Sequence, residues 1–210
     1  MSNLGLGNLA DLKTHCLQAA AGADTQWDDV FAGLGKGAAK AMQNFCNRDF
    51  ERSTAVVDEF TADRAYWITR RHPIESVVSI HQRDSMAEGW IALTVNDVIV
   101  NRGDDRGLLE FGTVLGTHES RIKVTYAGGY WFDTAEDYST ALPSGATRVP
   151  DDLKLAWLTQ VNAWFLKRDK LNLIAAAGAN PEAGAMVAAL AGRALEPEVA
   201  LMLQPFRRYV

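Results

Sequence analysis

The sequence predicts an α+β protein, mainly a helical bundle with an inserted small antiparallel β-sheet and a C-terminal helical arm. Three observations predict this class. Apolar side chains recur at helical spacing in residues 25–47 and 150–173. Between these stretches the pattern changes to short runs rich in β-branched and aromatic residues. Near the end, an Ala- and Gly-rich segment leads into a short apolar helix with Pro197 at its start.

Two helices are expected at the N-terminus. The first spans residues 8–20, where Asn8 can cap the helix by accepting a hydrogen bond from a free backbone N–H. The second spans residues 25–47, and Thr25 and Asp28 have the spacing of a capping box, with Asp in the usual place of Glu or Gln. The regular apolar spacing of the second helix makes it a strong packing element.

The second expected helix contains three glycines at alternate positions. Each glycine inside a helix costs up to about 1 kcal/mol relative to alanine. The pattern therefore indicates either close packing against a neighbouring element or a break near Gly35. The three residues are Gly33, Gly35 and Gly37.

The middle of the chain, residues 53–130, is expected to form antiparallel strands. Glycines and Pro73 separate the short β-type runs, which is typical of hairpins. The expected strands are residues 54–60, 65–69, 76–81, 90–95, 97–100, 107–111 and 121–126. The polar stretch that follows, residues 130–147, is too long for a simple connector and is typical of a functional or mobile loop.

A Trp-rich helix is expected at residues 150–173, with Pro150 in the first helical position. The helix is apolar over much of its circumference, so it is either central in its own fold or buried by a neighbouring subunit. One stripe carries Leu153, Ala156, Trp157, Val161 and Trp164, and the opposite side carries Leu155, Leu158, Phe165 and Leu166. Trp157, Val161, Trp164 and Phe165 are the candidates for a subunit interface or a core.

The bulk composition is that of an ordinary globular protein of 210 residues with a net charge of -5. The negative charge argues against a surface that grips nucleic acid through many phosphates. Cys16 and Cys46 lie in apolar helical patterns, which favours two buried thiols in a reducing cytoplasm over a disulfide. No run approaches the roughly 18 apolar residues that span a bilayer, so neither export nor membrane insertion is expected.

The sequence contains no pattern that carries known catalytic chemistry. The four histidines form no HExxH or similar arrangement, and no GxxxxGK[ST] or GxSxG occurs. Asp104 with Asp105, and Asp151 with Asp152, are adjacent carboxylates that a turn and a helix start explain. We therefore expect no catalytic residues, no metal, no cofactor and no enzymatic activity.

Several short motifs occur in order along the chain. The most specific are Pro-Ile-x-Ser-Val at residues 73–77, Tyr-x-Gly-Gly-Tyr at 126–130 and Val-Pro-x-Asp-Leu-Lys at 149–154. Weaker ones are the Leu-x-x-Leu-Lys opening at residues 9–13, Asn-Arg-Asp-Phe at 47–50 and the final Pro-Phe-Arg-Arg at 205–208. In this order the motifs resemble those of the head-tail connector, or adaptor, proteins of long-tailed bacteriophages. The middle strand region and the Ala/Gly-rich segment are longer than a minimal connector needs.

The resemblance implies a non-enzymatic virion protein at the head-tail interface, assembled in the host cytoplasm. It implies a homo-oligomeric ring of twelve subunits that joins the portal protein to a tail-side neck or tail-terminator protein. DNA would pass through the ring without sequence-specific binding, and no membrane is involved. Residues 1–174 would be the connector domain, and residues 175–210 a tether with a docking arm.

Two sets of residues are candidates for contact sites in such a ring. The C-terminal arm has the aromatic and arginine composition of an interface hot spot, although a solvated terminus is the alternative. Its candidate portal-binding residues are Leu203, Pro205, Phe206, Arg207, Arg208 and Tyr209. Acid-rich loops would face the channel or the neck through Asp104, Asp105, Asp133, Glu136 and Asp137. The alternative functions are another soluble neck or tail-completion protein and an uncharacterised enzyme.

Overall fold

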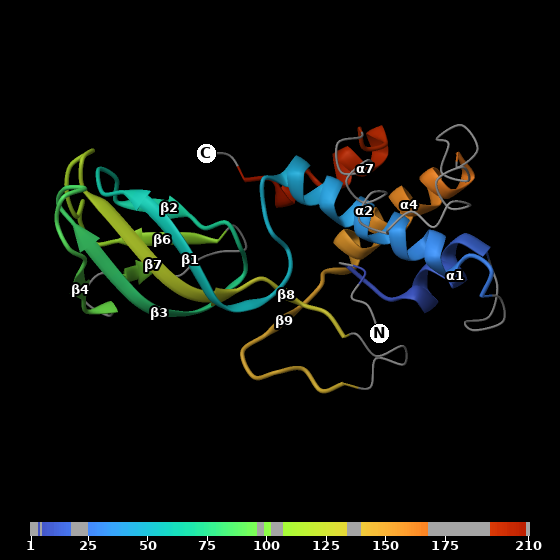
Figure 1. Ribbon diagram of the computed structural model, residues 1–210, viewed down its shortest axis with the longest axis horizontal. Coiled ribbons are helices and arrows are strands. Elements are labelled where there is room, and N and C mark those ends of the chain that lie inside the picture. Colours follow the sequence, from blue (N-terminus) through green and yellow to red (C-terminus); the bar gives the residue numbers. More distant parts are fainter. Residues whose placement is uncertain are drawn as a thin grey trace. The chain divides into compact units, whose positions relative to one another are not determined.

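The computed structural model describes residues 4, 6–17, 25–95, 99–101, 107–133, 140–167 and 194–208. The chain divides into two compact units (Figure 1). The first, here called the helical unit, comprises Met1–Arg48, Phe132–Leu142 and Arg148–Arg207. The second, here called the β unit, comprises Asp49–Trp131, Pro143–Thr147 and Arg208–Val210.

The expectation of a mainly helical bundle is wrong. The described residues form nine strands in three sheets beside four α-helices and one 3-10 helix. The physical reason lies in the short β runs of the middle region, which bury one another's side chains and form a hydrophobic core of their own. The strands therefore make up a separate compact unit with its own core, instead of a small sheet inserted into a helical bundle.

The helical unit is organised around the Trp-rich helix α4, which packs against α1, α2 and α7. Figure 1 shows α1, α2 and α7 gathered around α4. Their bounds are α1 Leu9–Leu17, α2 Asp28–Cys46, α4 Asp151–Leu166 and α7 Pro197–Met202, and the 3-10 helix η1 spans Gln204–Phe206. The side of α4 that faces the other helices carries the predicted apolar stripe, and all five of its side chains are buried.

The cap predicted at Asn8 is confirmed, whereas the one at Thr25 is wrong. The Asn8 side-chain oxygen accepts a hydrogen bond from the Asp11 backbone N–H at 2.9 Å, and the Asp11 carboxylate accepts one from the Asn8 N–H at 3.1 Å. This reciprocal pair is a capping box. At α2 the N-cap residue is Trp27, which makes no side-chain cap bond. Asp28 forms an ion pair with Lys13 Nζ at 2.6 Å instead.

The glycines of α2 permit close packing, and the helix continues through Gly35 without a break. A Cβ atom at Gly35 would lie 3.0 Å from the ring of Trp157, which is tighter than ordinary contact. The Trp157 indole N–H donates a hydrogen bond to the Gly35 carbonyl at 2.8 Å. The indole can reach that carbonyl because no side chain stands between them.

The β unit contains a strand at each of the seven places that the sequence predicts. A four-stranded antiparallel sheet has the order β1-β7-β3-β4, and a three-stranded one has the order β2-β6-β5. Their bounds are β1 Ser53–Thr61, β2 Tyr66–Ile68, β3 Ile74–Arg83, β4 Ile91–Leu93, β5 Ile99–Asn101, β6 Leu108–Phe111 and β7 Arg121–Gly128. A further pair, β8 Tyr130–Trp131 and β9 Thr147–Arg148, occupies the two ends of the expected polar loop.

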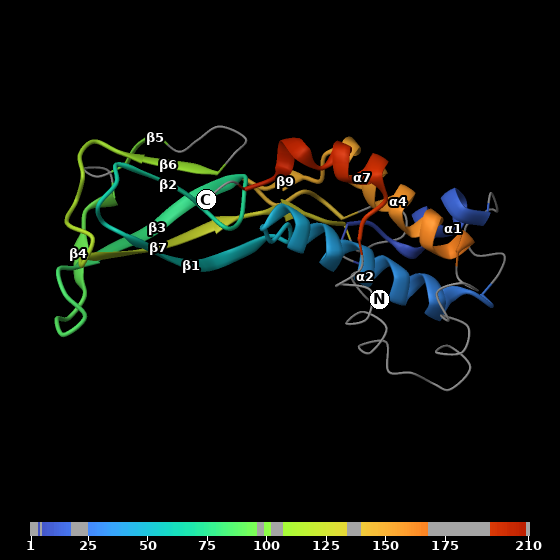
Figure 2. The ribbon, with the colours of Figure 1, turned by 90° about the horizontal axis from the view of Figure 1, so that it is seen from above.

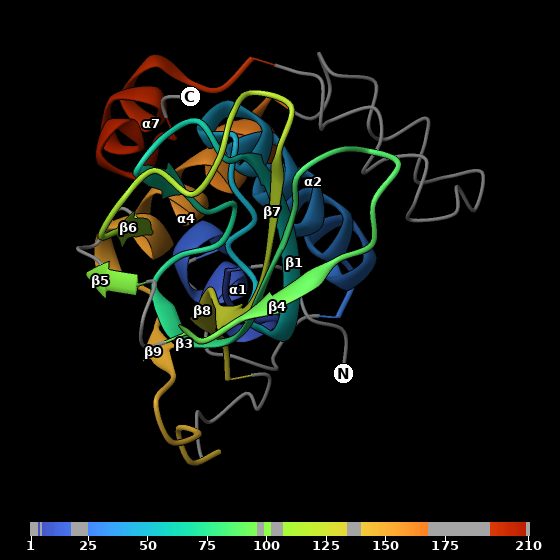
Figure 3. The ribbon, with the colours of Figure 1, turned by 90° about the vertical axis from the view of Figure 1, so that its left-hand side faces the viewer.

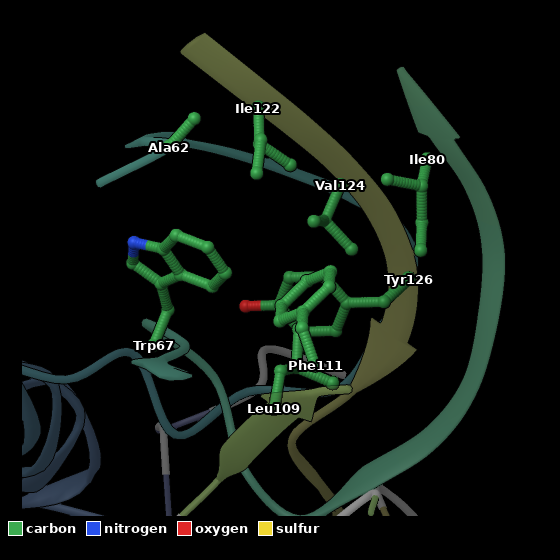
Figure 4. Close-up of a cluster of buried hydrophobic side chains, with 8 residues drawn as sticks. All are labelled: Ala62, Trp67, Ile80, Leu109, Phe111, Ile122, Val124 and Tyr126. Carbon is green, nitrogen blue, oxygen red and sulfur yellow. The ribbon is translucent and has the colours of Figure 1, made fainter. Parts of the chain in front are cut away.

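The core of the β unit lies between its two larger sheets. Figure 2 shows β2, β5 and β6 as a layer separate from β1, β3 and β7, and Figure 3 shows β5 and β6 apart from β1 and β7. Ile122, Val124 and Tyr126 project from β7 toward Leu109 and Phe111 on β6 (Figure 4). Residues of β7 with odd numbers point to the other face, because side chains alternate along a strand.

The Tyr-x-Gly-Gly-Tyr motif marks a place where two backbone segments approach closely. A Cβ atom at Gly128 would lie 2.8 Å from the Pro73 carbonyl oxygen, and one at Gly129 would lie 2.5 Å from that of Glu51. Gly129 also has a φ of +100°, which disfavours other residues. The backbone N–H of Gly129 donates to Pro73 at 2.9 Å, and that of Tyr130 donates to Phe50 at 2.7 Å. The motif therefore has a structural explanation within the β unit.

Candidate functional site

The C-terminal segment, residues 194–208, is largely packed against the helical unit. Val199, Leu203 and Phe206 are buried, with Phe206 only 8% exposed. The Cys46 thiol at the end of α2 lies 3.8 Å from the Leu203 carbonyl and donates to it. Pro205 and Arg207 are exposed.

Polar contacts fix the start of this segment to α4. The Glu196 backbone N–H donates to the side-chain oxygen of the buried Gln160 at 2.9 Å. The Glu196 carboxylate forms an ion pair with Lys167 Nζ at 2.7 Å. At the other end, the Arg207 guanidinium lies over the Phe45 ring, 5.1 Å from its centroid. Contacts thus anchor the segment both before α7 and after η1.

Arg208 lies in the β unit, where its side chain is partly buried near Asp58, Arg70 and Tyr126. Burial lowers the pKa of its guanidinium, and the Asp58 carboxylate acts in the opposite direction. Of the other candidate portal-binding residues, Leu203 and Phe206 belong to the helical core, and Tyr209 lies outside the described residues. Portal binding by this segment stays a prediction.

Asp58 and Tyr126 form the centre of a buried polar network in the β unit. The Tyr126 hydroxyl donates to the Asp58 carboxylate at 2.9 Å, and the Arg70 backbone N–H donates to the same oxygen at 2.8 Å. The Tyr126 oxygen accepts from the Arg71 backbone N–H at 3.0 Å. Burial, followed by the nearby Asp58 charge, raises the pKa of Tyr126, so its hydroxyl stays protonated.

The other predicted site residues are placed as follows. Trp157, Val161, Trp164 and Phe165 all lie in the core of the helical unit. Asp133 is buried, and its carboxylate accepts a hydrogen bond from the Thr140 backbone N–H at 2.9 Å. A channel-facing or neck-facing role for its loop stays a prediction. Asp104, Asp105, Glu136 and Asp137 lie outside the described residues.

The two thiols are free, with Cys46 buried and Cys16 half-buried. Burial raises the pKa of Cys16 to about 11 and that of Cys46 to about 12. In the parts of the chain that the structure describes, no three His, Cys, Asp or Glu side chains gather in a way that could hold a metal ion. Within the same parts, no helix has the length and apolar character to cross a bilayer.

A cluster that sequence reasoning missed lies on the outer face of the four-stranded sheet. There the Trp90 ring is flanked by the Arg83 guanidinium, 4.4 Å from the ring centroid, and by Lys123 Nζ, 4.5 Å from it. The signal was present in the alternation of β7, where Arg121 and Lys123 occupy odd positions between buried even ones. The pairing of β7 with its neighbours was not readable from one sequence.

The fold is similar to that of a chain in the virion of a native gene transfer agent particle. The similarity covers 96% of this chain and 89% of the other, with a TM-score of 0.51 and 13% sequence identity. A chain in the neck of an empty particle of this type, computed with C6 symmetry, matches over 74% of this chain and 75% of the other, with a TM-score of 0.49 and 16% identity. No protein-family model and no curated protein matches the sequence.

Proposed function

We propose that this chain is a non-enzymatic structural protein of the neck of a phage-type particle, where it connects the portal to the tail. The observation that carries the proposal is the fold similarity to a chain of a gene transfer agent virion, which extends over 96% of this chain. The ordered connector-like motifs support it independently. Two of these motifs have a clear place in the fold. The motif at residues 126–130 forms the close backbone approach at Gly129, and the motif at residues 149–154 forms the start of α4.

In this proposal the chain forms a ring of twelve subunits with a central passage for DNA. The portal lies on one side, and a tail-side neck or tail-terminator protein lies on the other. A ring subunit needs two different contact surfaces, one for each neighbour. The exposed Leu155, Leu166 and Leu201 of the helical unit, at 48%, 69% and 72% exposure, offer apolar area beyond its core. The net charge of -5 disfavours adhesion of passing DNA.

The direct test is disruption of the gene in the genome that encodes the particle. We expect DNA-filled heads and separate tails by electron microscopy, with joining restored when the gene is supplied in trans. Labelled antibody should bind at the junction of complete particles. Normal joining without the gene would show that the protein does not connect heads to tails.

The portal contact is proposed to use the exposed residues of the C-terminal segment. Deleting residues 204–210 would also remove Phe206 from the helical core, so it is an ambiguous test. The substitution Arg207→Glu keeps Phe206 and reverses the charge of an exposed side chain. It should reduce head-tail joining, whereas Phe45→Leu, which also removes the contact between the Arg207 guanidinium and the Phe45 ring but changes no charge, should join normally. Equal joining by both variants would place the portal contact elsewhere.

A further inference from the structure

The outer face of the four-stranded sheet carries a block of cationic side chains whose positions the strand register fixes. Lys123 of β7 pairs with Glu59 of β1 on one side and with His81 of β3 on the other. Two residues along the strand, Arg121 pairs with Arg83 of β3. Partners in an antiparallel pair lie about 4.5–5.5 Å apart, so these side chains form a continuous cluster.

Trp90 lies across this cluster and holds two of its cations in place. The Arg83 guanidinium and Lys123 Nζ each lie within 4.5 Å of the indole ring centroid, which is within cation–π range. Arg83 also forms a loose ion pair with Glu59 at 3.8 Å. The cations are thus fixed by contacts within the sheet, so binding a partner costs little additional side-chain entropy.

The block has an excess of positive charge. Among the described residues on this face, Arg83, Arg121 and Lys123 stand against one carboxylate, that of Glu59. The block is therefore suited to a partner that supplies carboxylates.

We propose that this surface, here called the basic sheet face (Glu59, His81, Arg83, Trp90, Arg121 and Lys123), binds an acidic surface of a second copy of the chain. The inference rests on the proposed ring and names one of its two contact surfaces. The whole chain has a net charge of -5, so the remainder of each copy is more acidic than the whole and complements this face. Trp and Arg are also the residues most enriched at protein interface hot spots.

Duplex DNA is the competing partner for a basic face. The observations favour protein, because the three cations on the described part of this face, Arg83, Arg121 and Lys123, are few for neutralising phosphates. The preference is testable with the same variants.

The first experiment measures self-association by sedimentation over a concentration series at pH 7 and low salt. The variant carries Arg121→Glu and Lys123→Glu, and a control with the same change in charge carries Lys40→Glu and Arg64→Glu at exposed positions elsewhere. The wild-type chain and the control should associate alike, and the variant at least about tenfold more weakly. Added salt should weaken association of the wild type. A wild-type chain that stays monomeric throughout, or a variant that associates like the control, overturns the proposal.

The second experiment identifies the acidic surface. Isotope-labelled and unlabelled chains are mixed and treated with a carbodiimide, which couples an amine directly to a carboxylate. Mass spectrometry should find Lys123 joined to a carboxylate of the differently labelled copy. Absence of such a mixed cross-link overturns the proposal. So does duplex DNA binding by the wild type that the Arg121→Glu, Lys123→Glu variant loses.

The test of the basic sheet face can fail without failure of the proposed connector function, and the two results can be told apart. If the Arg121→Glu, Lys123→Glu variant supports head-tail joining as well as the wild type does, the basic sheet face is not a ring contact, and the connector function stands. If heads and tails join without the gene, the connector function itself fails.

Discussion

The hydroxyl of Tyr126 lies 2.9 Å from the carboxylate of Asp58, although 68 residues separate them in sequence. The pair connects β7 to β1, which are neighbours in the four-stranded sheet. The Arg70 backbone N–H also donates to the Asp58 carboxylate, and the Arg71 N–H donates to the Tyr126 hydroxyl oxygen. The network therefore also fixes the chain between β2 and β3. A buried network of this kind stabilises a fold only while every member keeps its partner.

The variant Tyr126→Phe should therefore destabilise the protein by about 1–3 kcal/mol. It removes one donor from the buried Asp58 carboxylate and the acceptor of the Arg71 N–H. Urea unfolding monitored by circular dichroism measures the loss. Tyr66→Phe is the matched control, because Tyr66 is 56% exposed, and it should change little. Equal stabilities of the two variants would contradict the importance of the network.

Trp164→Ala should cost about 3–5 kcal/mol, because Trp164 is 3% exposed and lies in the core of the helical unit. Its control is Leu166→Ala on the same helix, where Leu166 is 69% exposed and the expected change is within about 0.5 kcal/mol. Thermal unfolding of both variants provides the comparison. An unchanged melting temperature for Trp164→Ala would show that the indole does not support the fold.

Alkaline pH should destabilise the protein through Cys46. Burial raises the pKa of this thiol from 9.0 to about 12 in the folded chain, so above pH 9 the unfolded chain releases a proton that the folded chain retains. The stabilising contribution is complete below about pH 9 and is lost progressively up to about pH 12. Unfolding free energies from pH 8 to 11 should decline less steeply in Cys46→Ala than in the wild type.

The same burial should make Cys46 unreactive toward alkylating agents at pH 8, since the thiolate is the nucleophile. Modification should become rapid when urea unfolds the protein. Rapid labelling of native Cys46 would show that its thiol is accessible.

Gly129→Ala should cost more than Gly145→Ala, although both glycines have a positive φ. At Gly145, with a φ of +80°, nothing lies within 4 Å of an added Cβ, so only the conformational cost of about 1–2 kcal/mol applies. At Gly129 the added atom would also meet the Glu51 carbonyl at 2.5 Å. The destabilisation by Gly129→Ala minus that by Gly145→Ala measures the cost of the overlap with the Glu51 carbonyl. A difference near zero would show that this overlap costs nothing.

Local sequence patterns predicted the positions of individual elements well. The seven β runs, the Asn8 cap and the Trp stripe of α4 depend on periodicity and neighbouring residues, which one sequence displays. The size of the β region relative to the helices was underestimated, because the core of the β region forms between two sheets. The pairing of strands depends on contacts across the whole region, such as that of Val124 with both Asp58 and Ile80.

The candidate site was harder to predict for the same reason. The composition of the C-terminal segment predicted a contact site, but the burial of Phe206 depends on helices that are distant in sequence. The cluster of Arg83, Trp90 and Lys123 becomes visible only when β3, β4 and β7 are aligned. These three side chains come from separate parts of the sheet region, so no regular sequence spacing relates them.

The close approach at Gly128 and Gly129 bears on how distant relatives of this chain can be found. Most positions of a protein tolerate exchange of one side chain for another of similar size and polarity. A position where any Cβ atom meets a neighbouring backbone does not, because no rotamer can relieve the overlap. Such positions should persist while the rest of a sequence diverges. A search for the paired glycines together with the close backbone approach that they permit should therefore find more distant relatives than a search by overall sequence similarity.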